Sequence, residues 1–136
     1  MKVIACVSDG GGMLFAGRRV SSDAVLISDV ERLVGESVLF VSDYSAPLFE
    51  GGALSTVCAS DPLACADNED FVFLEAAGLE AYKEKVDTLV IYRWNRKYPF
   101  DVKLDFDPSS AGMRLCEVVE FSGKAHPKIT RERWER

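Results

Sequence analysis

The chain has 136 residues, of which 48% are hydrophobic and 28% charged, and its net charge is −6. This composition suits one globular domain over residues 1–136 and is unlike that of a disordered chain. The negative charge argues against binding to nucleic acids or anionic membranes, and no apolar run reaches the ~18 residues that span a bilayer. The first residues lack a basic region followed by a cleavage site, so we expect a cytoplasmic protein.

The cysteines indicate free thiols. Cys6, Cys58, Cys65 and Cys116 form no C-x-x-C pair, and Cys6 and Cys116 lie within apolar, strand-like runs. A zinc site would require several of these scattered cysteines to converge, because His126 is the single histidine. We therefore expect buried free cysteines and predict no metal site.

The first two thirds of the chain alternate strands with helices. Residues 2–8 predict a strand buried on both faces, and residues 23–34 predict a helix that Ser21 or Ser22 caps, with Asp29 on its polar side. The other expected elements are strands at 37–41, 54–58, 71–74 and 88–94, a helical turn at 44–49, a surface loop at 60–70 and a helix at 77–85.

After residue 94 the pattern changes to alternating, strand-like segments joined by turns, at 100–106, 113–121 and 128–134. Such segments are typical of antiparallel strands, and the arginines around Trp134 are typical of a charge-protected edge strand. The sequence therefore predicts an α/β domain with a mostly parallel central sheet and a C-terminal antiparallel hairpin.

The end of the first strand is the first candidate site. Gly10, Gly11 and Gly12 follow that strand, and Arg18 and Arg19 stand in a basic turn before the helix. Three glycines indicate either a mobile lid or a tight turn. The two arginines could bind a carboxylate or phosphate, or they could lie exposed in a loop.

A second candidate site is the aromatic and basic cluster at 92–99. Arg93, Trp94 and Arg96 lie at the carboxyl end of an expected strand, where open α/β sheets bind ligands. Aromatic faces beside guanidinium groups suit a small planar or anionic ligand, or a protein partner. The alternative is a strand end packed on the core, and exposed Trp94 and Tyr98 would also suit the interface of a homo-oligomer.

The order and spacing of these segments resemble the dihydrofolate reductase family over most of the chain. The matching segments are Val7–Asp9 with Gly12–Met13, Gly17–Val25, Val38–Val41, Asp87–Ile91, Asp105–Pro108 and Met113–Phe121. The resemblance implies a dihydrofolate reductase-like fold with Cys6, Ser42 and Tyr44 near the ligand. It also implies that Asp23 is the catalytic acid that holds the substrate ring and supports its protonation. The residue alone is more typical of a helix cap or of an acid in the first turn of a helix.

The chain departs from the family's pattern in three places. Arg18–Ser21 stands where the family has a Pro and a Trp, Ser42–Ser45 replaces the phosphate-binding Gly-Arg-Lys/His-Thr motif, and Glu75–Ala77 replaces a Gly-Gly pair. Asp43 therefore lies where a cation should meet the cofactor phosphate, and Glu75 adds a second negative charge. The sequence predicts poor binding of NADPH and leaves the cofactor open.

These observations support a non-catalytic or divergent protein that binds a ligand other than NADPH. One alternative is a small NAD(P)H-dependent reductase that uses Asp23 near its substrate. Another alternative is an oligomeric structural or interaction module. The sequence leaves open whether the protein is an enzyme.

Overall fold

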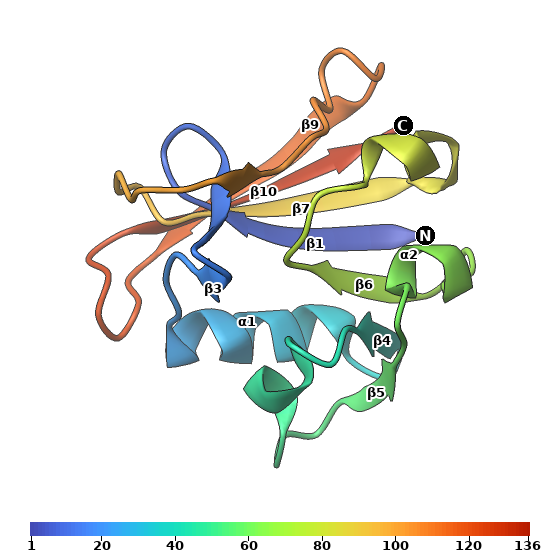
Figure 1. Ribbon diagram of the computed structural model, residues 1–136, viewed down its shortest axis with the longest axis horizontal. Helices are drawn as coiled ribbons and strands as arrows, with labels where there is room; N and C mark the ends of the chain where they lie inside the picture. Colours follow the sequence, from blue (N-terminus) through green and yellow to red (C-terminus); the bar gives the residue numbers. More distant parts are fainter.

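The central feature of the computed structural model, which describes residues 1–136, is a seven-stranded sheet (Figure 1). Its strands are β1 (Lys2–Val7), β4 (Val38–Val41), β5 (Ser55–Cys58), β6 (Phe71–Leu74), β7 (Thr88–Arg93), β9 (Arg114–Phe121) and β10 (Ile129–Glu135). They lie side by side in the order β5-β4-β6-β1-β7-β10-β9. The first five are parallel, and β10 and β9 are antiparallel to their neighbours. The predicted fold class is confirmed.

Helix α1 (Ala24–Val34) covers one face of this sheet (Figure 1). Leu26, Val30 and Val34 recur at helical spacing and pack on that face beside Ile4. Val3 and its alternate neighbours on β1 point to the other face and form a second core layer. Because both faces are covered, β1, β6 and β7 are mostly apolar. Every residue of the parallel edge strand β5 is instead exposed.

A small second sheet extends the carboxyl end of β1. It consists of β2 (Gly12–Phe15), β3 (Arg18–Arg19) and β8 (Val102–Lys103). Gly10 and Gly11 adopt positive φ angles of 89° and 87° in the turn before β2. Gly12 lies under Phe100, where an added Cβ would come within 2.5 Å of the ring. The triple glycine thus forms a tight turn with a close backbone approach to an aromatic ring.

The short helices are η1 (Ala46–Phe49), α2 (Pro62–Cys65) and η2 (Glu80–Lys85), of which η1 and η2 are 3₁₀ helices. The predicted loop at 60–70 is wrong in part, because Asp61 caps α2 and Pro62 begins it. The helix predicted at 77–85 is instead a 3₁₀ segment in which Tyr82 leaves helical geometry. Asp105 accepts the N–H groups of Gly78 and Leu79 at 3.1 and 3.0 Å, so the segment before η2 is held by another loop.

The C-terminal hairpin corrects two predictions. β10 lies between β7 and β9, so its arginines are not on an edge strand. Arg131 reaches Asp29 on α1 and Glu117 on β9, which explains a basic side chain at an interior position. All four cysteines are free, but Cys58, Cys65 and Cys116 are exposed, so the prediction of buried thiols is wrong for these three. None of the helices has the length and apolar character needed to cross a membrane.

Candidate functional site

Asp23 stands at the start of α1, where an extended backbone turns into the helix. Its φ and ψ are −156° and 127°, and its carboxylate accepts the N–H of Val25 at 2.9 Å. Asp23 is therefore the N-cap itself, and the predicted caps Ser21 and Ser22 precede it. This position aims the carboxylate across the end of the sheet.

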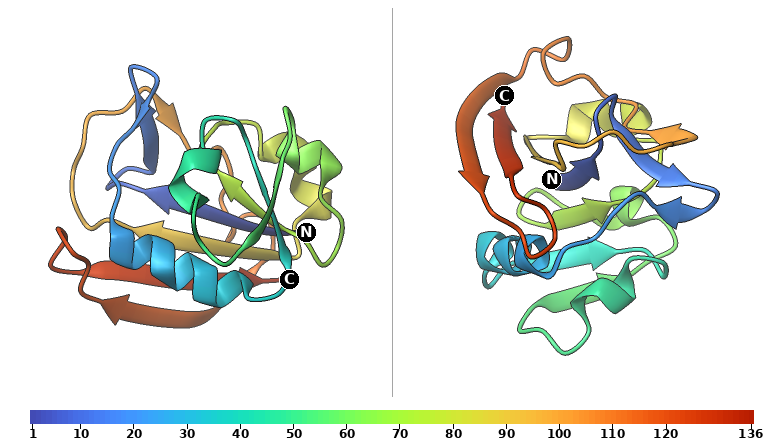
Figure 2. Two further views of the ribbon diagram at one scale, coloured as in Figure 1. Left: turned by 90° about the horizontal axis from the view of Figure 1, so that it is seen from below. Right: turned by 90° about the vertical axis from the view of Figure 1, so that its left-hand side faces the viewer.

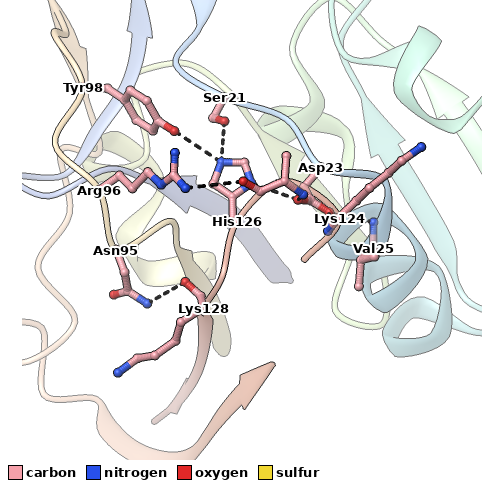
Figure 3. Close-up of polar contacts among 10 residues, drawn as sticks. Ser21, Asp23, Val25, Asn95, Arg96, Tyr98, Lys124, His126 and Lys128 are labelled. Atoms are coloured by element: carbon pink, nitrogen blue, oxygen red, sulfur yellow. Dashed lines mark hydrogen bonds and ion pairs between the residues drawn. The ribbon is translucent and has the colours of Figure 1, made fainter. Parts of the chain in front are cut away.

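The tip of the β9–β10 hairpin lies beside the start of α1 (Figure 2) and binds the same carboxylate (Figure 3). The N–H groups of Lys124 and Ala125 and Nδ1 of His126 each lie 2.9 Å from an oxygen of Asp23. Gly123 makes this approach possible, because an added Cβ would be 2.5 Å from Oδ2 of Asp23. The side chain of Asp23 is 0% exposed, so the hairpin encloses it completely.

The surrounding donors determine the ionisation of Asp23. Burial acts to raise the pKa of this carboxyl, but hydrogen bonds from Ala125, His126 and Lys124 stabilise the charged form and bring the pKa well below its usual range. An ionised carboxylate can only accept, so Nδ1 of His126 carries the proton that it donates.

His126 is buried among three further side chains. Its Nε2 lies 2.8 Å from Oγ of Ser21 and 3.3 Å from the hydroxyl of Tyr98. Its ring lies against Trp94, with the ring centroids 4.5 Å apart. Trp94 is 2% exposed, so the alternative of a strand end packed on the core holds for this residue, and Trp94 is not an exposed interface aromatic. The indole helps to shield the Asp23–His126 pair from water.

Little space remains beside the carboxylate of Asp23. This residue also lines an open groove of about 520 Å³ between α1 and η1, but its side chain is 0% exposed, so the carboxylate does not open into that groove. A cavity of about 10 Å³ is enclosed by side chains that include Cys6, Leu26, Phe73 and Trp94. That volume is on the order of one water molecule. The carboxylate is thus saturated by the chain's own donors and faces no room for a ring-sized ligand.

A second polar cluster lies at the carboxyl ends of β1, β4 and β6. Arg19 pairs with Glu75 through Nε and Nη2, at 2.8 and 3.0 Å, and its guanidinium stacks on the ring of Tyr44 at 4.5 Å. Ser45 donates its hydroxyl to Glu75 at 2.7 Å. Burial raises the pKa of the neighbouring Cys6 thiol, and Glu75 adds to that effect. The sequence predicted that Glu75 adds an unpaired negative charge near the cofactor position. In the structure, this charge is paired with Arg19.

A larger cavity, of about 330 Å³, opens on this side of the molecule. Its walls bring together Ser42 and Tyr44 after β4, Glu75–Ala77 after β6, and Asp61 before α2, with Leu14 and Leu63 as apolar walls. Among the side chains that line it, two are acidic and none is basic.

The structure separates the other predicted site residues. Gly10 and Gly11 form the turn before β2, and Arg18 is exposed on β3. Arg93 pairs with Glu132 on β10 at 2.8 Å. Arg96 contacts the carbonyl of Ala125 at 3.4 Å and thereby supports the hairpin tip.

His126 and Ser21 are the polar side chains of this site that sequence reasoning missed. His126 lies 103 residues from Asp23 along the chain, so no local spacing links the two. The available signals were a single histidine in a hairpin turn and a Ser-x-Asp pattern before a helix. Neither signal identifies a functional site unless the fold is known.

In sequence, the chain matches no protein-family model and no curated protein. In structure, it is similar to the dihydrofolate reductase from Enterococcus faecalis, which was solved in complex with NADP(H) and RAB-propyl. The TM-score is 0.67 at 11% sequence identity, over 100% of this chain and 96% of that one. The chain therefore has the dihydrofolate reductase-like fold that its segment order predicted.

Proposed function

We propose that this protein uses a dihydrofolate reductase-like fold to bind a small ligand other than NADPH, and that it does not reduce folates. The observation that carries the proposal is the saturated carboxylate of Asp23. Four donors of the chain itself occupy it, its side chain is 0% exposed, and the enclosed space beside it is only about 10 Å³. A substrate ring could reach Asp23 only if the hairpin tip withdrew and broke three of these hydrogen bonds.

The cavity of about 330 Å³ is the binding site that we propose. Its volume is at the lower end of the ~300–1,000 Å³ typical of small-molecule sites. Asp61 and Glu75 line it, and the guanidinium of Arg19 is already paired with Glu75. Without a free cation, a phosphate group would meet net negative charge there.

This lining refines the predicted ligand class. A small planar ligand can pack against the apolar walls and hydrogen-bond to the hydroxyls of Ser42 and Tyr44. The two acids favour a neutral or cationic ligand over an anionic one. We therefore propose a nucleoside-sized, uncharged or basic compound, and the NAD(P)H-dependent reductase remains the alternative.

The oligomeric alternative now depends on other residues. Trp94 is buried, so it offers no interface, whereas Leu115 and Val118 are exposed on the edge strand β9. The oligomeric alternative would therefore have to use the exposed edge of β9 around these two side chains.

A thermal-shift comparison tests the ligand proposal. We expect uncharged or basic nucleosides to raise Tm, and NADPH, NADH and folate to leave it unchanged, because a ligand that binds only the native state stabilises it. Ala77→Trp should remove the shift, since Ala77 lies in the cavity wall.

Ala53→Trp is the matched control, because Ala53 is exposed and lines none of the cavities described above. A Tm increase with NADPH that Ala77→Trp abolishes would contradict the proposal and favour the reductase. Equal loss of the ligand shift in both tryptophan variants would show that the ligand binds elsewhere.

A further inference from the structure

The geometry around His126 points to a second chemistry, and we propose that Ser21 is a nucleophile that His126 activates and Asp23 orients. The substrate class is a small activated acyl ester. This inference does not depend on the ligand proposed for the larger cavity, because it concerns a different set of atoms.

The backbone places Ser21 and Asp23 on the same side of the chain. The segment before α1 is extended at Asp23, and in an extended chain residues i and i+2 project to one side. Ser22, between them, points to solvent and is exposed. The imidazole of His126 can therefore contact both side chains with its two ring nitrogens (Figure 3).

The hydrogen bonds run in the direction that activation requires. Asp23 holds the proton on Nδ1 of His126 at 2.9 Å, which leaves the lone pair of Nε2 directed at Oγ of Ser21, 2.8 Å away. A hydroxyl within hydrogen-bond reach of a base that a third group orients is the general signature of an activated nucleophile. Tyr98 competes for the same lone pair from 3.3 Å, the longer of the two distances.

The chemistry balances with water as the only co-reactant. Oγ of Ser21 attacks the ester carbonyl carbon while its proton passes to Nε2 of His126. The tetrahedral intermediate expels the alkoxide or phenoxide, which takes the proton from Nε2, and an acyl-serine remains. Water then gives a proton to Nε2, attacks the acyl carbon and releases the acid, and Oγ of Ser21 takes the proton back.

The start of α1 offers donors for the negative charge of the intermediate. The N–H groups of Asp23 and Ala24 have no acceptor within the chain, and they lie at the positive end of an eleven-residue helix. Ser21 is partly exposed, whereas the cavity behind it holds only about 10 Å³. The acyl group must therefore approach from solvent and be small, such as acetyl.

Mass spectrometry with p-nitrophenyl acetate and a fluorophosphonate as the probes tests this proposal. We expect a single adduct on Ser21 in the native protein and its loss in Ser21→Ala. His126→Gln should slow adduct formation ~100-fold or more, the usual range for loss of a general base. An adduct at another residue, or no adduct on the folded protein, would overturn the assignment.

Two further variants keep the test decisive if His126→Gln does not fold. Tyr98→Phe removes the competing hydroxyl, so adduct formation should be as fast as in the parent or faster. Ser22→Ala, at the exposed neighbour, should leave the rate unchanged. If Tyr98→Phe and Ser21→Ala lost the adduct equally, the cluster would be structural and Ser21 would not be activated.

Discussion

Three side chains from different elements meet at the buried carboxylate of Asp29. Tyr92 donates its hydroxyl at 2.6 Å, Arg131 donates an N–H from Nη1 at 2.7 Å, and Arg32 is the third donor. The helical pattern placed Asp29 on the polar side of α1, but its side chain is only 5% exposed. The prediction is wrong because the curled β10 lies over that side of the helix and supplies Arg131. A buried charge is tolerated where paired donors replace water.

Tyr92→Phe should lower the free energy of unfolding by ~1–3 kcal/mol, the usual cost of a buried hydrogen bond to a charged group. The phenol is buried against Asp29, and burial followed by that contact raises its pKa well above the usual range. Urea unfolding measures the change. Tyr82→Phe is the control, because its hydroxyl contacts Asp61 at an exposed site and its loss should cost less than ~0.5 kcal/mol.

An unchanged stability in Tyr92→Phe would show that Arg131 and Arg32 satisfy Asp29 without the phenol. In that case the three-donor description of this carboxylate would be wrong.

At the scale of the elements, the strands of the seven-stranded sheet were predictable. Strands β2 and β3 of the small sheet were not predicted, and neither were the contacts of the connections. Continuous apolar runs identified β1, β6 and β7, because strands buried on both faces need no polar positions. The β9–β10 turn was recognisable from Ser122–Lys124. Its contact with Asp23 was not, since that contact depends on how far the hairpin curls toward α1 (Figure 2).

Gly123→Ala tests the close approach of this turn. An added Cβ would lie 2.5 Å from Oδ2 of Asp23 and 2.8 Å from Cδ1 of Ile129, so the hairpin tip must shift. We expect a loss of roughly 1–3 kcal/mol in unfolding free energy, as for other overpacked sites. Chemical denaturation followed by circular dichroism gives the value.

Ser122→Ala is the matched control, because Ser122 is the exposed neighbour in the same turn. The amide exchange of Lys124 and Ala125 should quicken in Gly123→Ala alone. Unchanged protection of these two amides would contradict the contact with Asp23.

At the scale of the whole molecule, Asp23 joins α1 to the C-terminal hairpin and so couples folding to pH. Its pKa is lowered in the folded protein, so the unfolded chain binds the proton more readily. This stabilisation is complete above the ordinary pKa of about 3.9 and is lost progressively as the pH falls below it.

Asp23→Asn should therefore flatten the decline in stability between pH 7 and pH 3, by about 1 kcal/mol, measured by urea unfolding at each pH. Glu69→Gln is the control, because that side chain is 91% exposed and should leave the profile as it is. Parallel pH profiles for the parent and Asp23→Asn would mean that the hairpin tip does not hold this carboxylate in solution.

The sequence by itself determined the fold class, because the alternation of apolar runs, caps and turns is local and each strand or helix carries its own periodicity. It also drew attention to Asp23 and to the stretches Ser42–Ser45 and Glu75–Ala77, each of which is a single stretch of chain. Only the tertiary structure decided what Asp23 contacts. Ser21, Asp23 and His126 come together because a hairpin folds back over a helix N-terminus, and contacts between residues more than 100 positions apart leave no periodic trace in the sequence.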